Sequence, residues 1–116
     1  MLYEIEFTEE FRLWYEVILT CAEQDSVAHV VRMLERSGPT LPHPYSSGIK
    51  RSKYSHMREL RIQHEGRPYR VLYAFDPRRT AMLLLGGEKT GDNRWYEAAI
   101  PRADAIYKQH LKEIEE

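Results

Sequence analysis

Two arginines, Arg61 and Arg70, have the spacing that most clearly suggests a chemical role. They lie in two segments that alternate apolar and polar residues, the period of half-buried β-strands. The dipeptide Glu65-Gly66 between the segments is typical of a tight turn. If these two residues form the turn, counting back from it places Arg61 directly opposite Arg70. Like charges opposed across two strands are destabilising, so an anion is expected beside them.

Two kinds of anion could neutralise this pair. One is local, because the carboxylate of Glu59 or Glu65 could reach diagonally across the strands. The other is a phosphate or carboxylate group of a bound partner. The local pattern slightly favours the first, whereas the distribution of charge along the chain favours the second.

Charge is segregated along the chain, although the net charge is only −1. Residues 1–47 contain 3 Lys/Arg and 8 Asp/Glu, residues 48–102 contain 12 and 6, and residues 103–116 contain 2 and 4. The central segment is therefore basic and the two ends are acidic. Such a directional field is expected of a surface that meets a polyanion.

A second group of cations lies in residues 38–56, where three prolines, two glycines and several serines predict a loop. The second half of this loop contains Lys50, Arg51, Lys53 and Tyr54. Cations interleaved with an aromatic ring suit phosphate contacts and base stacking. The alternative is a solvated loop whose charges only maintain solubility.

These cations, with nearby His and Tyr side chains, could cleave RNA without a metal ion. The 2′-hydroxyl must lose a proton, the charge on the phosphate must be stabilised, and the 5′-oxygen must gain a proton. Arg and Lys supply the stabilisation, and His56 or a Lys of lowered pKa can move protons. The same residues could instead only hold a nucleic acid or an acidic peptide. The five histidines and Cys21 form no ligand motif, so no metal or cofactor is expected.

The elements that position these residues are predicted from hydrophobic periodicity. Residues 57–89 are expected to form three consecutive antiparallel strands, followed by a glycine-rich exit over 86–92 that lacks the spacing of a nucleotide-binding P-loop. Residues 2–7 alternate as a first strand, and Thr8 is expected to cap a helix. The predicted inner face of that helix is aromatic: Phe11, Trp14, Tyr15, Ile18 and Leu19.

Two more helices are expected. The second starts at Asp25 or Ser26, presents Val27, Val30, Val31 and Leu34 to the core, and ends at Gly38-Pro39. The last begins at Pro101, because proline suits the first helical position. Its predicted inner face is Ala103, Ile106, Tyr107, His110, Leu111 and Ile114. Trp95 and Tyr96, in an ambiguous segment before it, are expected to pack on the sheet.

The predicted fold class is α+β: a twisted antiparallel sheet with an N-terminal helical hairpin and a C-terminal helix. A chain of 116 residues, 42% apolar and 30% charged, suits a single domain over 1–116. It has no apolar run long enough to span a bilayer, and its N-terminus is acidic, unlike a signal peptide. With one cysteine, a cytoplasmic setting is expected.

The order of these elements resembles the RelE/ParE toxin superfamily. Four segments resemble its HigB-like, phage-derived branch: SGPTLPHP, MRELRI, YRVLYAFDPRRTAMLLLGGEKTG and RWYEAAIPRADAIYKQHL. The resemblance extends from Phe11 to Leu111. It implies a cytoplasmic toxin that cleaves mRNA on the translating ribosome, and a cognate helix-turn-helix antitoxin as its partner.

The resemblance also implies site residues. The family's basic positions would fall on Lys50 or Lys53, Arg58, Arg61, Arg70 and Lys89, and the opposed arginines are where the family holds the scissile phosphate. We therefore expect Arg61 and Arg70 to hold that phosphate and Lys53 and Lys89 to hold its neighbours. Proton transfer is assigned to His56 or a Lys. RNA contacts are expected from Lys50, Arg51, Tyr54 and Arg58.

Two features leave alternatives open. Several ribonucleases of the family use a Tyr or His near the C-terminus, which the terminal LKEIEE lacks, and His110 is expected to pack instead. His56, Tyr54, Tyr96 or Lys53 would have to replace it. The superfamily also contains gyrase poisons with the same fold. The alternatives are a gyrase-directed ParE-like toxin without nuclease activity, or a non-catalytic nucleic-acid-binding module.

Overall fold

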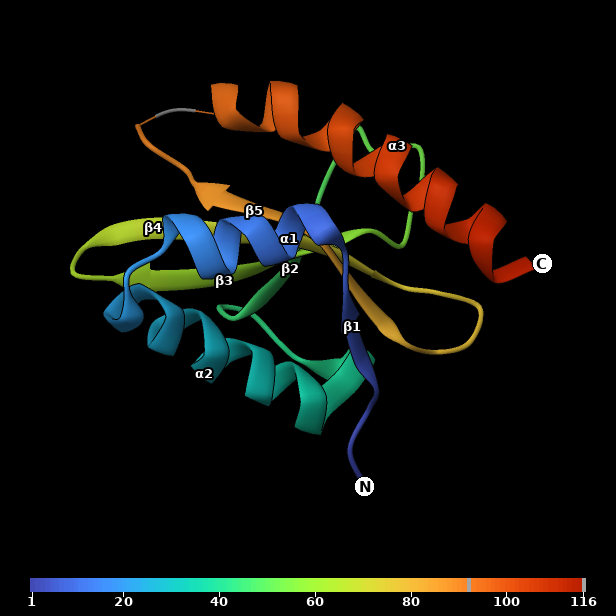
Figure 1. Ribbon diagram of the computed structural model, residues 1–116, viewed down its shortest axis with the longest axis horizontal. Helices are drawn as coiled ribbons and strands as arrows, with labels where there is room; N and C mark the ends of the chain where they lie inside the picture. The colour runs from blue at the N-terminus through green and yellow to red at the C-terminus, as the bar shows by residue number, and fades with distance from the viewer. Residues whose placement is uncertain (92, 116) are drawn as a thin grey trace.

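A five-stranded sheet with strand order β1-β5-β4-β3-β2 is the framework of the fold (Figure 1). The computed structural model describes residues 1–91 and 93–115, so Asp92 of the predicted exit and Glu116 of LKEIEE lie outside the described residues. The strands are β1 (Ile5–Phe7), β2 (Ser46–Gly48), β3 (Arg58–His64), β4 (Arg67–Phe75) and β5 (Ala81–Glu88). The helices are α1 (Glu9–Leu13), the π-helical turn η1 (Trp14–Ile18), α2 (Cys21–Ser37), the 3-10 turn η2 (Gly38–Thr40) and α3 (Arg94–Glu115).

The predicted meander and its register are confirmed. His64 pairs with Arg67, Ile62 with Tyr69, Arg61 with Arg70 and Leu60 with Val71. Glu65 and Gly66 form the turn with φ of 51° and 78°, which is the left-handed geometry that a two-residue hairpin requires. The like-charge opposition predicted from the sequence is therefore present in the sheet.

The sheet is mixed, and this corrects the prediction of an antiparallel one. β1 pairs parallel with β5, with Ile5 opposite Ala81 and Phe7 opposite Leu83. A second correction lies inside the predicted loop over 38–56, where β2 pairs antiparallel with β3. Each of these strands has three residues, too few to show a period in the sequence, so only the neighbouring strand determines their conformation.

The first helix starts as predicted but changes its period. The Thr8 hydroxyl accepts a hydrogen bond from the Phe11 N–H and caps α1. The chain then enters η1, where the Leu19 N–H donates to the Trp14 carbonyl five residues back. The wider turn rotates Ile18 away from the core, so its predicted burial is wrong and it is exposed, whereas Phe11 and Leu19 are buried.

The predicted start of α2 at Asp25 or Ser26 is wrong, because the helix begins at Cys21. Thr20 caps it: its hydroxyl accepts from the Glu23 N–H, and the Glu23 carboxylate accepts from the Thr20 N–H. This reciprocal pair is the T-x-x-E capping box. The predicted end is confirmed at Gly38, which has a φ of 59° and lies against the Tyr3 ring, where no Cβ would fit.

The last helix also begins earlier than predicted, at Arg94, with Pro101 inside it. A proline inside a helix costs about 3 kcal/mol because it lacks an N–H and its ring crowds the preceding turn. Packing of the first turns against the sheet offsets this cost, since Ala99 and Ile100 are buried and Trp95 is half-buried over Gly87. The predicted inner face is confirmed, with Ala103, Tyr107 and His110 buried.

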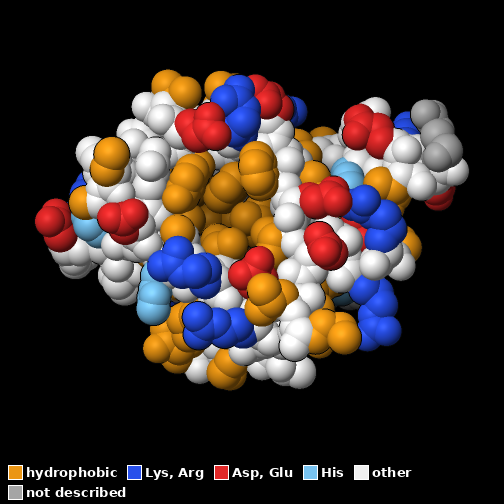
Figure 2. Space-filling view, turned by 60° about the horizontal axis from the view of Figure 1, so that its bottom comes forward, with side chains coloured by type: hydrophobic (Ala, Val, Ile, Leu, Met, Phe, Trp, Pro, Cys, Tyr) orange, Lys and Arg blue, Asp and Glu red, His pale blue; other side chains and the backbone are white. Residues whose placement is uncertain are grey.

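The helices divide between the two faces of the sheet (Figure 1). α1, η1 and α2 cover one face, and α3 covers the other. Between α1–η1 and α2 the surface is hollowed and apolar (Figure 2). This hollow, called the apolar groove below, is lined by Ile5, Phe7, Phe11, Arg12, Tyr15, Glu16, Ala28, Val31, Arg32, Glu35 and Leu83.

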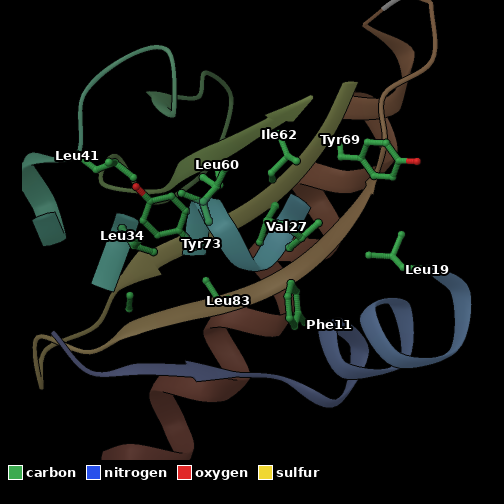
Figure 3. Close-up of a cluster of buried hydrophobic side chains, with 13 residues drawn as sticks. Phe11, Leu19, Val27, Leu34, Leu41, Leu60, Ile62, Tyr69, Tyr73 and Leu83 are labelled. Atoms are coloured by element: carbon green, nitrogen blue, oxygen red, sulfur yellow. The ribbon is translucent and has the colours of Figure 1, made fainter. Parts of the chain in front are cut away.

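Each face of the sheet has its own core. The face under α1 and α2 contributes Leu60, Ile62 and Tyr73, which pack with Val27 and Leu34 of α2 (Figure 3). The opposite face contributes Leu72 and Leu84, which pack against α3. No helix among residues 1–91 and 93–115 is long and apolar enough to cross a membrane.

Candidate anion-binding site

The strand alternation places a charged cluster on the face of the sheet that α3 covers. Leu60 and Ile62 of β3 point into the core under α2, so Glu59 and Arg61 point to the opposite face. Arg70 of β4 points to the same face as its neighbour Leu72, which packs against α3. Three charges therefore lie within one small area of the sheet.

Glu59 is the internal counterion of both arginines. Its carboxylate lies 3.1 Å from the Arg61 guanidinium and 3.5 Å from Nε of Arg70. The side chains of Glu59 and Arg70 are 5% exposed, whereas that of Arg61 is 34% exposed. The local alternative considered for the opposed arginines is thus present for Glu59. Glu65 instead lies exposed beside His64.

Tyr96 of α3 completes the cluster. Its hydroxyl donates to Oε1 of Glu59 at 2.5 Å and accepts from Nε of Arg70 at 3.3 Å. Burial raises the pKa of Tyr96, and the hydrogen bond to Glu59 raises it further. Tyr96 therefore keeps its proton at neutral pH and holds one oxygen of Glu59 in place.

A cavity of about 310 Å³ opens beside this cluster, at the lower end of the size range of small-molecule sites. The predicted loop forms one wall through Lys50 and Arg51, and Asn93, Tyr96 and Ile100 form the other. Glu59 lines its floor. The Lys89 ammonium lies 5.9 Å from the centre of the Tyr96 ring. We call this cavity with Arg61, Arg70 and Lys89 the cationic cleft.

Of the predicted site residues, Lys50 and Arg51 line the cavity itself, whereas Arg61 and Arg70 adjoin it through Glu59 and Lys89 adjoins it through the ring of Tyr96. Lys53 is exposed, and its backbone N–H and the Ser52 hydroxyl both donate to Asp104 of α3. This contact fixes the loop on α3 and leaves the Lys53 side chain in solvent.

Besides Lys53, three predicted residues are not brought to the cleft: Arg58, His56 and Tyr54. Arg58 shares the opposite face of β3 with Leu60, and its Nε donates to Ser46 at 3.0 Å. His56 and Tyr54 instead contact Tyr107, with His56 Nε2 2.9 Å from the Tyr107 hydroxyl and the Tyr54 ring 4.8 Å from the Tyr107 ring. Tyr107 lies eleven residues beyond Tyr96 on the same helix, a rise of about 16 Å.

The sequence predicts Glu59 only as a possible local counterion and Tyr96 only as one possible replacement for a missing proton-transfer residue. The alternation of β3 does place Glu59 on the same face as Arg61, so its role as a counterion could be inferred from the sequence. The contact of Tyr96 could not, because it depends on how α3 packs across the sheet. His110 packs as predicted and contacts Asp76 at 2.8 Å.

The cleft can bind an anion and has one carboxylate to accept a proton. Lys50, Arg51, Arg61, Arg70 and Lys89 outnumber Glu59, so the cleft remains cationic after internal neutralisation. Among the described residues, no three His, Cys, Asp or Glu side chains gather as metal ligands. The exposed part of Arg61 and the loop cations are the groups that a phosphate could reach from solvent.

The fold and the cleft define a small α+β protein that presents a cationic site beside a mixed sheet. Residues 19–108 match the family described as "Phage derived protein Gp49-like (DUF891)", and the chain belongs to this family. "Putative toxin HigB3" of Mycobacterium tuberculosis (strain ATCC 25618 / H37Rv) is 46% identical over 80 residues, which cover 68% of each chain. "Putative toxin HigB2" of the same strain is 38% identical over 88 residues, which cover 74% of this chain and 44% of that one. The resemblance to the HigB-like branch is confirmed.

Proposed function

We propose that this chain is the toxin of a type II toxin–antitoxin system and cleaves mRNA on translating ribosomes without a metal ion. Its family and its HigB relatives support the toxin role, and toxin–antitoxin membership implies an antitoxin partner. The cationic cleft supports the nuclease role. The main support for the nuclease role is Glu59, a buried carboxylate that pairs with two arginines and lines an open cavity.

The chemistry follows from an exchange of counterions. When the scissile phosphate enters the cleft, Arg61 and Arg70 bind its oxygens and release the carboxylate of Glu59. Glu59 then accepts the proton of the 2′-hydroxyl, whose oxygen attacks phosphorus as the bond to the 5′-oxygen breaks. The arginines stabilise the charge that develops on the phosphate. Lys89 supplies the proton for the leaving 5′-oxygen, and Lys50 and Arg51 hold the adjacent phosphates.

Arg61 gives a cleaner test of this mechanism than Arg70. Arg70 is buried and paired, so its removal also disturbs the fold, whereas Arg61 is partly exposed. Removing one positioned charge-stabilising group typically lowers a rate by 10²- to 10³-fold. We expect this loss for Arg61→Ala and a comparable loss for Glu59→Gln, which keeps the size of the side chain but cannot accept the proton.

The test is 5′-end mapping of cellular mRNA shortly after the protein is induced in a bacterium. The wild type should produce new cuts within translated frames, and Arg61→Ala should not. Arg79→Ala is the matched control, because Arg79 is an exposed arginine in the turn between β4 and β5. Arrested growth with intact mRNA would exclude the nuclease and direct attention to gyrase. Normal growth with intact mRNA would leave a binding module.

A further inference from the structure

Arg51 has a backbone conformation that a residue other than glycine seldom adopts. Its φ is 73°, in the left-handed region where a side chain crowds the backbone. Glu65 and Arg79 share this conformation but lie in the tight turns of the meander, whereas Arg51 lies in the longer loop between β2 and β3. Arg51 also lines the cavity of the cationic cleft. A strained residue persists only where its surroundings hold it, and such residues gather at ligand-binding sites.

The contacts that hold Arg51 begin at the next residue. The Ser52 hydroxyl donates to Oδ1 of Asp104 at 2.6 Å, and the Lys53 N–H donates to Oδ2 of Asp104 at 2.9 Å. The Tyr54 N–H donates to the Ser52 hydroxyl at 3.0 Å. Asp104 lies on α3 and is only 6% exposed, so one buried carboxylate fixes the two residues that follow Arg51. We call its two hydrogen bonds to the loop the loop clamp.

A second contact holds the far end of the same loop on α3 (Figure 1). The Tyr54 ring meets the Tyr107 ring edge-on, with 4.8 Å between the ring centres, and His56 Nε2 lies 2.9 Å from the Tyr107 hydroxyl. These contacts do not involve Asp104. Breaking the loop clamp should therefore free residues 50–53 and leave residues 54–56 attached to α3.

A carboxylate suits the loop clamp because it has two acceptor oxygens and no hydrogen to donate. Each oxygen of Asp104 accepts from a different donor of the loop. Asparagine has nearly the same shape but presents an NH₂ group to one of these donors, so it can accept only one of the two hydrogen bonds. Hydrogen bonds to a charged acceptor are also stronger than those between neutral groups. Asp104→Asn therefore weakens the clamp with almost no change in volume.

We propose that Asp104 is a positioning residue for the cationic cleft: it clamps the loop to α3 and so directs the guanidinium of Arg51 onto a phosphate of the bound RNA. Asp104 does not line the cavity, so it acts only through the loop. This inference rests on the proposed function in taking RNA as the anion, but it does not depend on which residues move protons. The alternative is that Asp104 only stabilises the fold.

The test is a titration of the full chain with a single-stranded RNA whose 2′-hydroxyls are all O-methylated, so that binding is measured without cleavage. Arg51→Ala removes one phosphate contact. We expect the slope of log affinity against log salt to become shallower by about 0.7, which is a loss of affinity of about fivefold at 0.1 M salt. Asp104→Asn should reproduce both changes.

The sign of the Asp104→Asn effect is informative because the variant keeps every cation and removes one negative charge. Long-range electrostatics alone would raise its affinity for RNA. Glu113→Gln is the matched control, since Glu113 is an exposed carboxylate nine positions later in α3. We expect its affinity to equal or slightly exceed that of the wild type.

Double variants separate positioning from general stability. In the Asp104→Asn background, Arg51→Ala should lower the affinity by less than twofold more, because the guanidinium has already lost its contact. Arg61→Ala should lower the affinity by the same factor in both backgrounds, since Arg61 is held by Glu59 and not by the loop.

A second variant and a second measurement keep the result decisive if Asp104→Asn fails to fold. Ser52→Ala removes one hydrogen bond of the clamp from the loop side and should also lower the affinity. In both variants the amides of residues 50–53 should exchange hydrogen faster, while those of β3 keep wild-type rates. Wild-type or higher affinity in the folded variants, or additive losses in Asp104→Asn/Arg51→Ala, would overturn the clamp alone. Failure of the wild type to bind RNA would overturn the proposed function as well.

Discussion

The two faces of the sheet meet solvent in opposite ways. The cationic cleft is charged but internally neutralised, because Glu59 pairs with Arg61 and Arg70 and accepts from Tyr96. The apolar groove has no such compensation, since Phe7 is half exposed and its neighbours line an open hollow. The charges of the cleft are therefore paired within the chain, whereas the groove leaves apolar surface open to solvent. One sheet thus separates a charged surface whose side chains are paired from an apolar surface that is open to solvent.

A buried carboxylate on each face makes the contrast sharper. On the groove side, Glu23 accepts from Thr20, Tyr69 and Arg67, which tie α2 to β4. On the cleft side, Glu59 has similar partners but also borders a cavity. Among the described residues, no buried side-chain nitrogen or oxygen lacks a hydrogen bond. Both carboxylates are buried and hydrogen-bonded, so it is the position of Glu59 beside the cavity that makes it a candidate for function.

The largest effect is expected from Arg70→Ala. Removing one partner of a buried ion pair costs about 3–5 kcal/mol, and we expect the lower value because Arg61 and Tyr96 still satisfy Glu59. Urea unfolding should show this loss of stability together with loss of RNA cleavage. In the double variant Glu59→Gln/Arg70→Ala most of the lost stability should return, since the one charge of the cluster that then lacks its partner, that of Arg61, is partly exposed to solvent. An equal loss in both variants would show that Glu59 is not the cause.

Phe7→Ala should separate the two faces. Urea unfolding should show a loss of stability of about 2 kcal/mol, since half of the Phe7 ring is buried and it contacts the Phe11 ring. RNA cleavage should not change, because Phe7 lies on the face opposite the cleft. Val17→Ala, which truncates an exposed apolar residue that does not line the groove, serves as the control. Impaired cleavage in Phe7→Ala would mean that the faces are coupled.

Tyr96→Phe removes the hydroxyl that holds Glu59 and should have a smaller effect on stability, about 1 kcal/mol for one hydrogen bond. Cleavage should fall with little change in RNA affinity, because the phenol positions the carboxylate and does not bind phosphate. Single-turnover cleavage and equilibrium RNA binding would be measured side by side. If affinity alone falls, Tyr96 contributes to binding rather than to positioning.

Glu23→Gln retains the capping box in its Glu/Gln form but removes the carboxylate charge, so its effect on stability depends on pH. The Thr20 N–H and the Tyr69 hydroxyl hold the pKa of Glu23 at about 2, below the ordinary value of about 4.3. A lowered folded-state pKa contributes stability that is complete above about pH 4.3 and is lost as the pH falls toward 2. Urea unfolding between pH 6 and pH 3 should therefore show a flatter decline for Glu23→Gln than for the wild type. Glu97→Gln, at an exposed position, should decline as the wild type does.

Local patterns in the sequence were sufficient for the meander and its register. A two-residue turn and a period of two leave one consistent pairing, so the opposition of Arg61 and Arg70 could be counted from Glu65-Gly66. The Thr20–Glu23 capping box is also a local pattern, and it places the start of α2 at Cys21 rather than at Asp25 or Ser26. The predicted start of the last helix at Pro101 is wrong. Proline usually occupies the first helical position, but the packing of Trp95 and Ile100 on the sheet extends this helix back to Arg94.

The sequence by itself determined the basic centre, the opposed arginines and the membership of the Gp49-like family, because each depends on neighbours along the chain. Only the tertiary structure decided which cations share a site. Arg58 and Arg61 are three residues apart, yet the alternation of β3 and the helix packed on each face separate them. Tyr96 reaches Glu59, 37 positions earlier in the chain, because α3 crosses the sheet there. The groove likewise depends on how α1–η1 and α2 pack beside one another, which no local pattern encodes.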